Sequence, residues 1–140
     1  MKSVCQCGTC EIEIKTTQHN TLNCHCGMCR AQSGAAFTTW VTIDRPKVNL
    51  DNPPKALTHY QLSKHASTYF CSICGTNVYT LDSRHPEIVA FPAGVLKNIK
   101  ITPPAGDYFF SHKADWFIDR GATQKYGGEN GFTPLTNKSK

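Results

Sequence analysis

The eight cysteines of this 140-residue chain lie in three short clusters, and their spacing constrains the fold more than any other feature of the sequence. The clusters read Cys5-Gln6-Cys7-Gly8-Thr9-Cys10, Cys24-His25-Cys26-Gly27-Met28-Cys29 and Cys71-Ser72-Ile73-Cys74-Gly75. Thiols one or two residues apart on a turn can reach the same metal ion, and zinc favours four ligands in a tetrahedron, with thiolates among them. A glycine follows one cysteine of each cluster and eases the backbone around the ligands. The spacing therefore predicts metal binding, with zinc as the ion.

A disulfide framework is the main alternative, because eight is an even number of cysteines. The chain begins with Met1-Lys2-Ser3-Val4-Cys5 and shows no apolar signal segment, so we expect a reducing, cytoplasmic location. A disulfide within a Cys-x-Cys pair would be strained, and a chain of this length can bury a core without covalent staples. Metal binding is therefore favoured over disulfides and over free or redox-active thiols.

The composition predicts one folded domain with a core of its own. Hydrophobic residues make up 39% of the chain and charged residues 18%, which is compatible with a packed interior. No stretch approaches the roughly 20 apolar residues that a membrane span needs, so no membrane partner is expected. We expect the zinc-binding domain to cover residues 2–132 and a polar tail to cover residues 133–140.

The formal net charge of +5 raises the question of nucleic-acid binding, but it counts every cysteine as neutral. Cysteines that bind a metal do so as thiolates. Seven thiolates around two Zn²⁺ ions would lower the net charge to about +2. The lysines and arginines are also scattered, and Lys97-Asn98-Ile99-Lys100 is the nearest approach to a basic run. A nucleic-acid partner is therefore not expected.

Short alternating and β-branched segments predict a mainly β fold. Cys10–Thr16 alternates apolar and polar residues, as half-buried strands do, and Ala36–Ile43 is rich in β-branched and aromatic residues. Ala56–Leu62 and Ser67–Cys71 are predicted to form a hairpin. Further strands are predicted at Thr21–Cys24, Val48–Leu50, Asn77–Leu81, Ile88–Pro92 and Tyr108–Ser111, and one helical turn at Met28–Gln32. No amphipathic helix of three or more turns is expected.

Spacing alone leaves the division of the sulfurs between two ions open. Eight thiols could form two closed four-cysteine sites, which would be purely structural. In another arrangement two sulfurs of the first cluster join Cys71 and Cys74, and the second cluster keeps three ligands for its own ion. A histidine or Cys10 would complete that site, unless Cys10 is a core residue on the strand face of Ile12 and Ile14. Three protein ligands with one exchangeable position are how a catalytic zinc is built.

His25 lies inside the second cluster, between two cysteines. Its neighbours would bind an ion through alternate positions of a tight turn. We therefore expect the imidazole to point away from the metal, although histidine is a common metal ligand.

Four segments around the cysteines resemble the pattern of the glutathione-dependent formaldehyde-activating enzymes, a family that also includes the centromere protein V type. They are Val4-Cys5-Gln6-Cys7-Gly8, Cys24-His25-Cys26-Gly27-Met28-Cys29-Arg30, Ser33-Gly34 and Phe70-Cys71-Ser72-Ile73-Cys74-Gly75. Two downstream segments extend the likeness, Ala93-Gly94-Val95-Leu96 and Ser111-His112-Lys113-Ala114-Asp115-Trp116. The resemblance covers residues 2–120, nearly the whole domain.

The resemblance implies a fold and two sets of zinc ligands. The fold would be a zinc-clipped β-tent of the Mss4-like type, made of short antiparallel strands with few helical turns. The structural zinc would be held by Cys5, Cys7, Cys71 and Cys74. A second, more open zinc with a catalytic role would be held by Cys24, Cys26 and Cys29. Cys10 falls outside both sets, in agreement with its place on an apolar strand face.

The resemblance also implies a carbon–sulfur lyase activity on thiol adducts. A small thiol such as glutathione would add to formaldehyde and give S-hydroxymethylglutathione. Three thiolates on Zn²⁺ sum to a negative charge, which nearby cations or hydrogen-bond donors would offset. Arg30, Lys113 and His112 are candidates for this task, and Trp116 is a candidate wall of the pocket. The alternative is a non-catalytic, zinc-stabilised binding module.

Overall fold

The computed structural model of the protein describes residues 1–121 and 123–136. The chain divides into two compact units, each made of two stretches of sequence. The first unit holds Met1–His19 and Val41–Ile101, and the second holds Asn20–Trp40 and Thr102–Lys140. Residues 137–140 of the expected polar tail lie outside the described residues.

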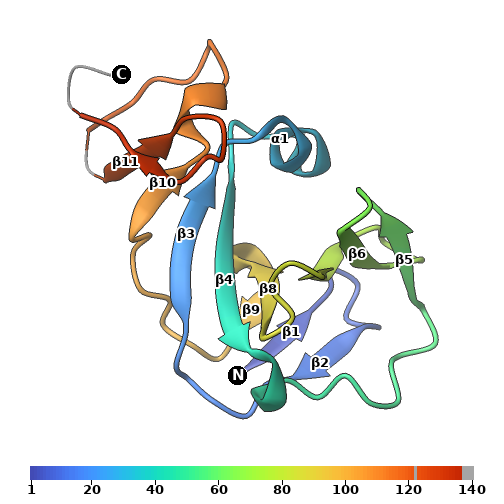
Figure 1. Ribbon diagram of the computed structural model, residues 1–140. Helices are drawn as coiled ribbons and strands as arrows, with labels where there is room; N and C mark the ends of the chain where they lie inside the picture. Colours follow the sequence, from blue (N-terminus) through green and yellow to red (C-terminus); the bar gives the residue numbers. More distant parts are fainter. Residues whose placement is uncertain (122, 137–140) are drawn as a thin grey trace. The chain divides into compact units, whose positions relative to one another are not determined.

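The first unit contains two rows of antiparallel strands (Figure 1). One row is β2 (Glu11–Glu13), β1 (Lys2–Val4) and β9 (Leu96–Lys97), in that order. The other row is β8 (Ile88–Pro92), β7 (Asn77–Asp82), β6 (Ala66–Cys71) and β5 (Leu57–Gln61). Two short 3-10 helices, η1 (Arg45–Lys47) and η2 (Ala93–Val95), belong to the same unit. Strand β4 (Thr38–Asp44) begins in the second unit and ends in the first.

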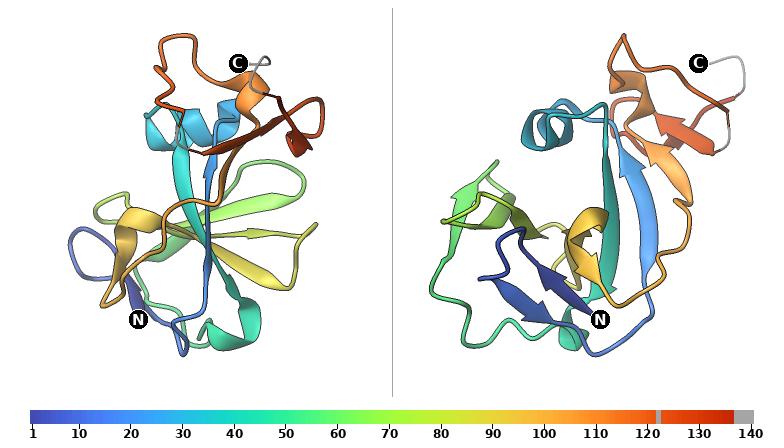
Figure 2. Two further views of the ribbon diagram at one scale, coloured as in Figure 1. Left: turned by 90° about the vertical axis from the view of Figure 1, so that its left-hand side faces the viewer. Right: turned by 180° about the vertical axis from the view of Figure 1, so that it is seen from behind.

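The hairpin of β5 and β6 leads into the third cysteine cluster, and its green strands are seen from two further sides in Figure 2. Leu57 lies opposite Cys71 at one end of the pair, and Gln61 lies opposite Ser67 at the other. The chain then turns after Cys71 and returns as β7, antiparallel to β6. The predicted hairpin is therefore confirmed, and its last residue is a cysteine of the third cluster.

An apolar core lies beneath these strands. It includes Cys10, Ile12, Ile14, Val41, Ile43, Val78, Val89 and Phe91. Burying a side chain of this size contributes about 1.5–3 kcal/mol. Ser3 and Thr68 are buried polar residues of this unit, and the Ser3 hydroxyl donates to the carbonyl of Val78 at 2.9 Å. The turns that carry cysteines in this unit therefore rest on a packed interior.

The second unit combines short strands with the single α-helix of the described residues. Its elements are β3 (Asn20–Cys24), α1 (Gly27–Ser33), β10 (Gly106–Tyr108), the 3-10 helix η3 (Phe110–His112), β11 (Gln124–Gly127) and β12 (Thr133–Pro134). Strand β10 runs parallel to both β3 and β11, and β12 is antiparallel to β11. Gly34 caps the C-terminus of the helix and adopts a left-handed φ of 70°.

The mainly β class predicted from the sequence is confirmed, with differences in detail. The strand predicted at Val48–Leu50 is wrong, because Val48 closes the η1 turn through its N–H and makes only an isolated bridge to Ile14. The strand predicted at Tyr108–Ser111 ends at Tyr108, because Phe109 has a left-handed φ of 56° and η3 follows. The parallel pairs of β10 and the short strands β1, β11 and β12 were not predicted.

Within the described residues, no helix has the length and apolar character that a membrane crossing requires.

Candidate metal centres

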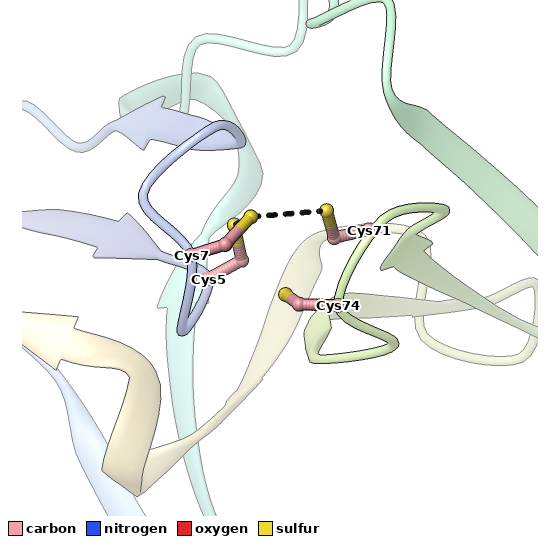
Figure 3. A group of neighbouring side chains, drawn as sticks. All are labelled: Cys5, Cys7, Cys71 and Cys74. Carbon is pink, nitrogen blue, oxygen red and sulfur yellow. Dashed lines mark hydrogen bonds between the residues drawn. The ribbon is translucent and has the colours of Figure 1, made fainter.

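Four sulfurs from two distant parts of the chain meet in the first unit (Figure 3). They belong to Cys5, Cys7, Cys71 and Cys74, and all four lie within 4.8 Å of one another. The Sγ atoms of Cys5 and Cys7 are 3.6 Å apart, and those of Cys7 and Cys71 are 3.8 Å apart. This group is called the four-sulfur group below.

Two similar turns present these sulfurs. After β1, the Gly8 N–H donates to the carbonyl of Cys5 at 3.0 Å, and Gly8 has a φ of 81°. After β6, the Gly75 N–H donates to the carbonyl of Cys71 at 2.8 Å, and Gly75 has a φ of 78°. Residues with side chains rarely adopt such φ values. Gly8 and Gly75, which follow Cys7 and Cys74, therefore allow these two turns to close.

The spacing of the sulfurs fits one zinc ion. A tetrahedral zinc with Zn–S bonds of about 2.3 Å places its sulfurs about 3.8 Å apart. A disulfide would need an S–S distance of about 2.05 Å, and all eight cysteines, which lie in the described part of the chain, are free thiols. The four-sulfur group could therefore hold a metal ion.

The four-sulfur group is buried on one side and open on the other. Cys5 and Cys71 are buried, Cys74 is half-buried and Cys7 is exposed. A cavity of about 420 Å³ borders the turn at Cys5–Gly8 and is also lined by Lys97. Solvent therefore reaches one edge of this group.

Cys74, which belongs to the four-sulfur group, and Cys10, which lies beside it, differ in acidity. A hydrogen bond with the Thr76 hydroxyl, 3.2 Å from the sulfur, lowers the pKa of Cys74 to about 5. Burial, together with the sulfurs of Cys71 and Cys5, raises the pKa of Cys10 to about 12. Cys10 is fully buried, and its backbone N–H donates to the Cys5 sulfur at 3.2 Å. It is a core thiol beside the group, as the strand pattern predicted.

Three sulfurs form a second group in the second unit, called the three-sulfur group below. They belong to Cys24, Cys26 and Cys29, and all lie within 4.8 Å of one another. Cys24 is the last residue of β3, Cys26 is the N-cap of α1, and Cys29 lies in the first turn of that helix. Among the described residues, no fourth ligand atom from His, Cys, Asp or Glu lies within that distance of all three. The group could hold an ion with three protein ligands.

The short helix creates the three-sulfur group. The Cys26 sulfur accepts the backbone N–H of Cys29 at 3.3 Å and so takes the place of the usual capping oxygen. A Trp40 indole N–H also reaches the sulfur of Cys29, with Nε1 and Sγ 3.4 Å apart. Sequence reasoning did not single out Trp40, because nothing in its local pattern distinguishes it from a strand residue.

Mutual hydrogen bonds divide the charge among the three thiols. The hydrogen bond with Cys26 raises the pKa of Cys24 to about 11. Hydrogen bonds from Cys24 and Cys29 lower the pKa of Cys26 to about 2. Hydrogen bonds with Cys24 and Cys26 raise the pKa of Cys29 far above its usual range. Without a metal, Cys26 is therefore the most acidic of the three thiols.

His25 turns away from the sulfurs, as expected, and enters an aromatic enclosure. Its ring is fully buried, and its centroid lies 4.9 Å from that of Phe37, 5.1 Å from Phe110 and 5.2 Å from Phe117. Its Nε2 lies 2.9 Å from a carboxylate oxygen of Asp107. His25 therefore anchors the cysteine turn and is not one of the grouped ligands.

Asp107 is the centre of a buried polar network that the sequence did not reveal. One of its oxygens accepts from His25 and from the Asn23 amide at 3.0 Å, so it holds both neighbours of Cys24. The other accepts from Thr123 and forms a 3.0 Å ion pair with Lys125. Burial raises the pKa of Asp107, but these hydrogen bonds outweigh it and hold the pKa below its usual range.

The other residues suggested by sequence occupy varied positions in the second unit. The Arg30 Nε–H donates to the carbonyl of His25 at 3.2 Å, which keeps its guanidinium near the cysteine turn. Lys113 Nζ lies 4.8 Å from the centroid of the Phe110 ring. His112 is exposed, and Trp116 has 65% of its surface exposed. Of these, Arg30 is the one with a contact to the turn that carries the three-sulfur group.

The family model described as "Glutathione-dependent formaldehyde-activating enzyme" matches residues 1–112. The chain belongs to this family. Its match includes every cysteine of both sulfur groups as well as Trp40, His25 and Asp107. Membership of the glutathione-dependent formaldehyde-activating family indicates a glutathione-related function that uses zinc, and both sulfur groups could hold such an ion.

A solved structure supports the fold. The crystal structure of a Rhodobacter sphaeroides protein is similar to this chain, with a TM-score of 0.59 and 24% sequence identity. The similarity covers 71% of this chain and 91% of that one. At this level of identity the likeness concerns the fold alone. No curated protein matches the sequence at a significant level.

Proposed function

We propose that the chain is a zinc-dependent enzyme of the carbon–sulfur lyase type that acts on thiol adducts in the cytoplasm. The proposed substrates are glutathione and formaldehyde, and the product is S-hydroxymethylglutathione. The observation that carries the proposal is a compact group of three cysteine sulfurs in a chain of the glutathione-dependent formaldehyde-activating family. Three protein ligands are typical of a catalytic zinc, because one position remains for a substrate.

The two sulfur groups would have different tasks. Cys5, Cys7, Cys71 and Cys74 would hold a structural zinc, because four sulfurs complete its coordination. Cys24, Cys26 and Cys29 would hold the catalytic zinc, and a thiol would take the open position. Two zinc ions per chain are therefore proposed.

In the proposed reaction, a carbon–sulfur bond forms between the thiol sulfur and the aldehyde carbon, and the thiol proton ends on the former carbonyl oxygen. Zinc in the three-sulfur group would make the bound thiol more acidic. The cysteine turn, anchored through His25 to Asp107, would hold the reactants in a fixed place. Arg30, bound to the carbonyl of His25, would attract a carboxylate of glutathione.

The test is an NMR exchange measurement on glutathione, formaldehyde and their adduct, with zinc-loaded protein. The spontaneous reaction sets the baseline. We expect exchange above this baseline with the wild-type protein and no acceleration with Cys26→Ser, which lacks one sulfur of the three-sulfur group. Exchange at the spontaneous rate with fully loaded wild-type protein would contradict the proposed substrates.

A binding module remains the second candidate, and one observation favours it. Trp116 and Ile118 expose 65% and 68% of their surfaces, although large apolar side chains gain free energy from burial. A partner protein that covers them would protect Trp116 from solvent. If the tryptophan fluorescence of the protein does not change when candidate partner proteins are added, while the exchange of glutathione and formaldehyde is accelerated, the binding-module hypothesis loses its support.

A further inference from the structure

Trp40 is one of the two tryptophans of the chain, and its indole nitrogen lies 3.4 Å from the sulfur of Cys29. Indole N–H is a donor only, so the direction of this hydrogen bond is unambiguous. The contact is partly buried, where water competes less for the donor. The indole therefore donates a hydrogen bond to a sulfur of the three-sulfur group.

Two hydrogen bonds hold the start of β4 against the elements that carry the three sulfurs. The Thr38 hydroxyl donates to the backbone carbonyl of Cys29 at 3.1 Å. The Thr39 hydroxyl donates to the side-chain oxygen of Asn23 at 2.7 Å, next to Cys24 in the sequence. Because both residues before Trp40 are tied to these elements, the indole is held in place relative to Cys29.

The donor has an electrostatic consequence for an ion in this group. Three thiolates around Zn²⁺ leave a net charge of −1, which reduces the ion's ability to acidify a further ligand. An N–H donor on a metal-bound sulfur draws electron density away from the metal. With an ion bound, the backbone N–H of Cys29 would do this at Cys26, and the indole of Trp40 would do it at Cys29.

We propose that Trp40 is a positioning residue of the second zinc site, which acts through Cys29 by hydrogen-bonding its thiolate and lowering the electron density that this sulfur gives to the ion. The catalytic consequence rests on the proposed function. The effect on the metal does not, because it depends only on zinc binding to the three sulfurs.

The variant that isolates this hydrogen bond is Trp40→Phe, which keeps an aromatic ring and removes the N–H. The matched control is Trp116→Phe, at an exposed tryptophan without a sulfur contact among its described interactions. Each variant is loaded with Co²⁺ in place of zinc, and the spectrum of the Cys26→Ser variant is subtracted to leave the second site. We expect the sulfur-to-cobalt charge-transfer band to move to longer wavelength in Trp40→Phe and to stay unchanged in Trp116→Phe.

Zinc affinity supplies a second readout. Changing an outer partner of a metal ligand typically costs 10- to 100-fold in metal affinity. The indole N–H also stabilises Cys29 as the thiolate, which is the form that binds zinc. We therefore expect Trp40→Phe to weaken zinc at the second site by about 10-fold or more in a chelator competition at neutral pH, with zinc at the four-sulfur group unaffected. Unchanged cobalt spectra and unchanged affinity in Trp40→Phe would overturn the proposal.

A wild-type measurement covers the case in which Trp40→Phe fails to fold. The indole N–H protons of both tryptophans are followed by NMR while zinc is added to protein whose four-sulfur group is already filled. We expect the Trp40 signal to shift as the second site fills, and the Trp116 signal to stay in place. A Trp40 signal that does not respond would overturn the proposal. If the band, affinity and signal behave as expected but glutathione exchange is absent, the proposed function fails while the role of Trp40 stands.

Discussion

Cys10 shows how the fold distinguishes cysteines that look alike in the sequence. It is fully buried in the apolar core, and burial raises its pKa to about 12. Its sulfur is also not one of the four that lie within 4.8 Å of one another. The third cysteine of the first cluster therefore acts as a small apolar residue.

Replacing Cys10 tests this assignment. Cys10→Ala should keep two zinc ions per chain and lower the free energy of unfolding by about 1–2 kcal/mol, because it leaves a small cavity in the core. Metal analysis and thermal unfolding measure the two effects. Loss of a zinc ion in Cys10→Ala would show that Cys10 is a ligand.

The acidity of the second cluster gives a prediction about pH. The pKa of Cys24 is raised to about 11 and that of Cys29 is raised further, whereas that of Cys26 is lowered. Zinc must therefore displace two protons at neutral pH, so its affinity should fall by about 100-fold for each unit of falling pH. Chelator competition between pH 6 and pH 8, on protein whose four-sulfur group stays filled, measures the slope. A slope of one proton or none would contradict this division of charge.

Residues of the candidate site were predictable only where their spacing is local. The Cys-x-Cys and Cys-x-x-Cys motifs identify the grouped sulfurs in the sequence, and a strand pattern placed Cys10 in the core. Trp40 and Asp107 carry no such signal. The contact of Asp107 with His25 joins residues 82 positions apart, so only the folded chain brings them together.

At the scale of elements, β10 supports β3 through Asp107. The carboxylate holds Asn23 and His25, which flank Cys24, and it pairs with Lys125 on β11. Successive side chains of a strand point to opposite faces, so the two anchored residues share a face that Cys24 does not. The parallel strand pairs therefore fix the position of a sulfur through its neighbours.

Removing this support should destabilise the second unit. Asp107→Ala removes one of the two carboxylates that pair with the buried Lys125, and Asp119 keeps its ion pair with Lys125 at 3.2 Å. It also leaves the buried donors of Asn23 and His25 without their acceptor, so the expected cost is about 2–3 kcal/mol. Lys2→Ala, which removes an exposed pair with Glu11, should cost at most about 1 kcal/mol. Chemical denaturation compares the two variants. Equal losses would contradict the central role of Asp107.

The carboxylate of Asp107 also makes the free energy of unfolding depend on pH in the acid range. Folding lowers the pKa of Asp107, so its charged form contributes to the free energy of unfolding above the ordinary carboxyl pKa of about 4. This contribution is lost as the pH falls through the pKa that Asp107 has in the folded protein. We expect the free energy of unfolding to fall below about pH 4 less steeply in Asp107→Asn than in the wild type. Parallel curves for the two proteins would exclude Asp107 from the acid transition.

Elements were predictable where a strand is long enough to show a pattern. The hairpin of β5 and β6 has five or six residues per strand and was placed correctly. Strands β1, β11 and β12 have two to four residues, too few for an alternation to appear. Their existence depends on pairing with distant segments, which local residue preferences do not encode.

At the scale of the whole molecule, each compact unit contains one sulfur group. An ion in the four-sulfur group would cross-link cysteines 64 positions apart, whereas the three-sulfur group spans only a short turn. By loop-closure entropy, a link across the longer loop is worth about 4 kcal/mol and one across the shorter loop about 2 kcal/mol. The first ion would therefore contribute more to stability.

Two serine variants test this difference. Cys71→Ser should unfold or aggregate the chain, because it removes a buried ligand of the long cross-link. Cys26→Ser should lose one zinc ion and leave the first unit folded. Thermal unfolding followed by circular dichroism compares them with the wild type. Equal losses of stability in both variants would contradict the division into a structural and an open site.

Native mass spectrometry, with and without glutathione, is the most direct test that the chain holds two zinc ions and that one of them accepts a thiol. We expect a wild-type mass with two zinc ions and, on addition of glutathione, one bound glutathione. We also expect that Cys26→Ser retains one zinc ion and binds no glutathione. A Cys26→Ser variant that keeps both zinc ions, or that binds glutathione as the wild type does, would contradict the account.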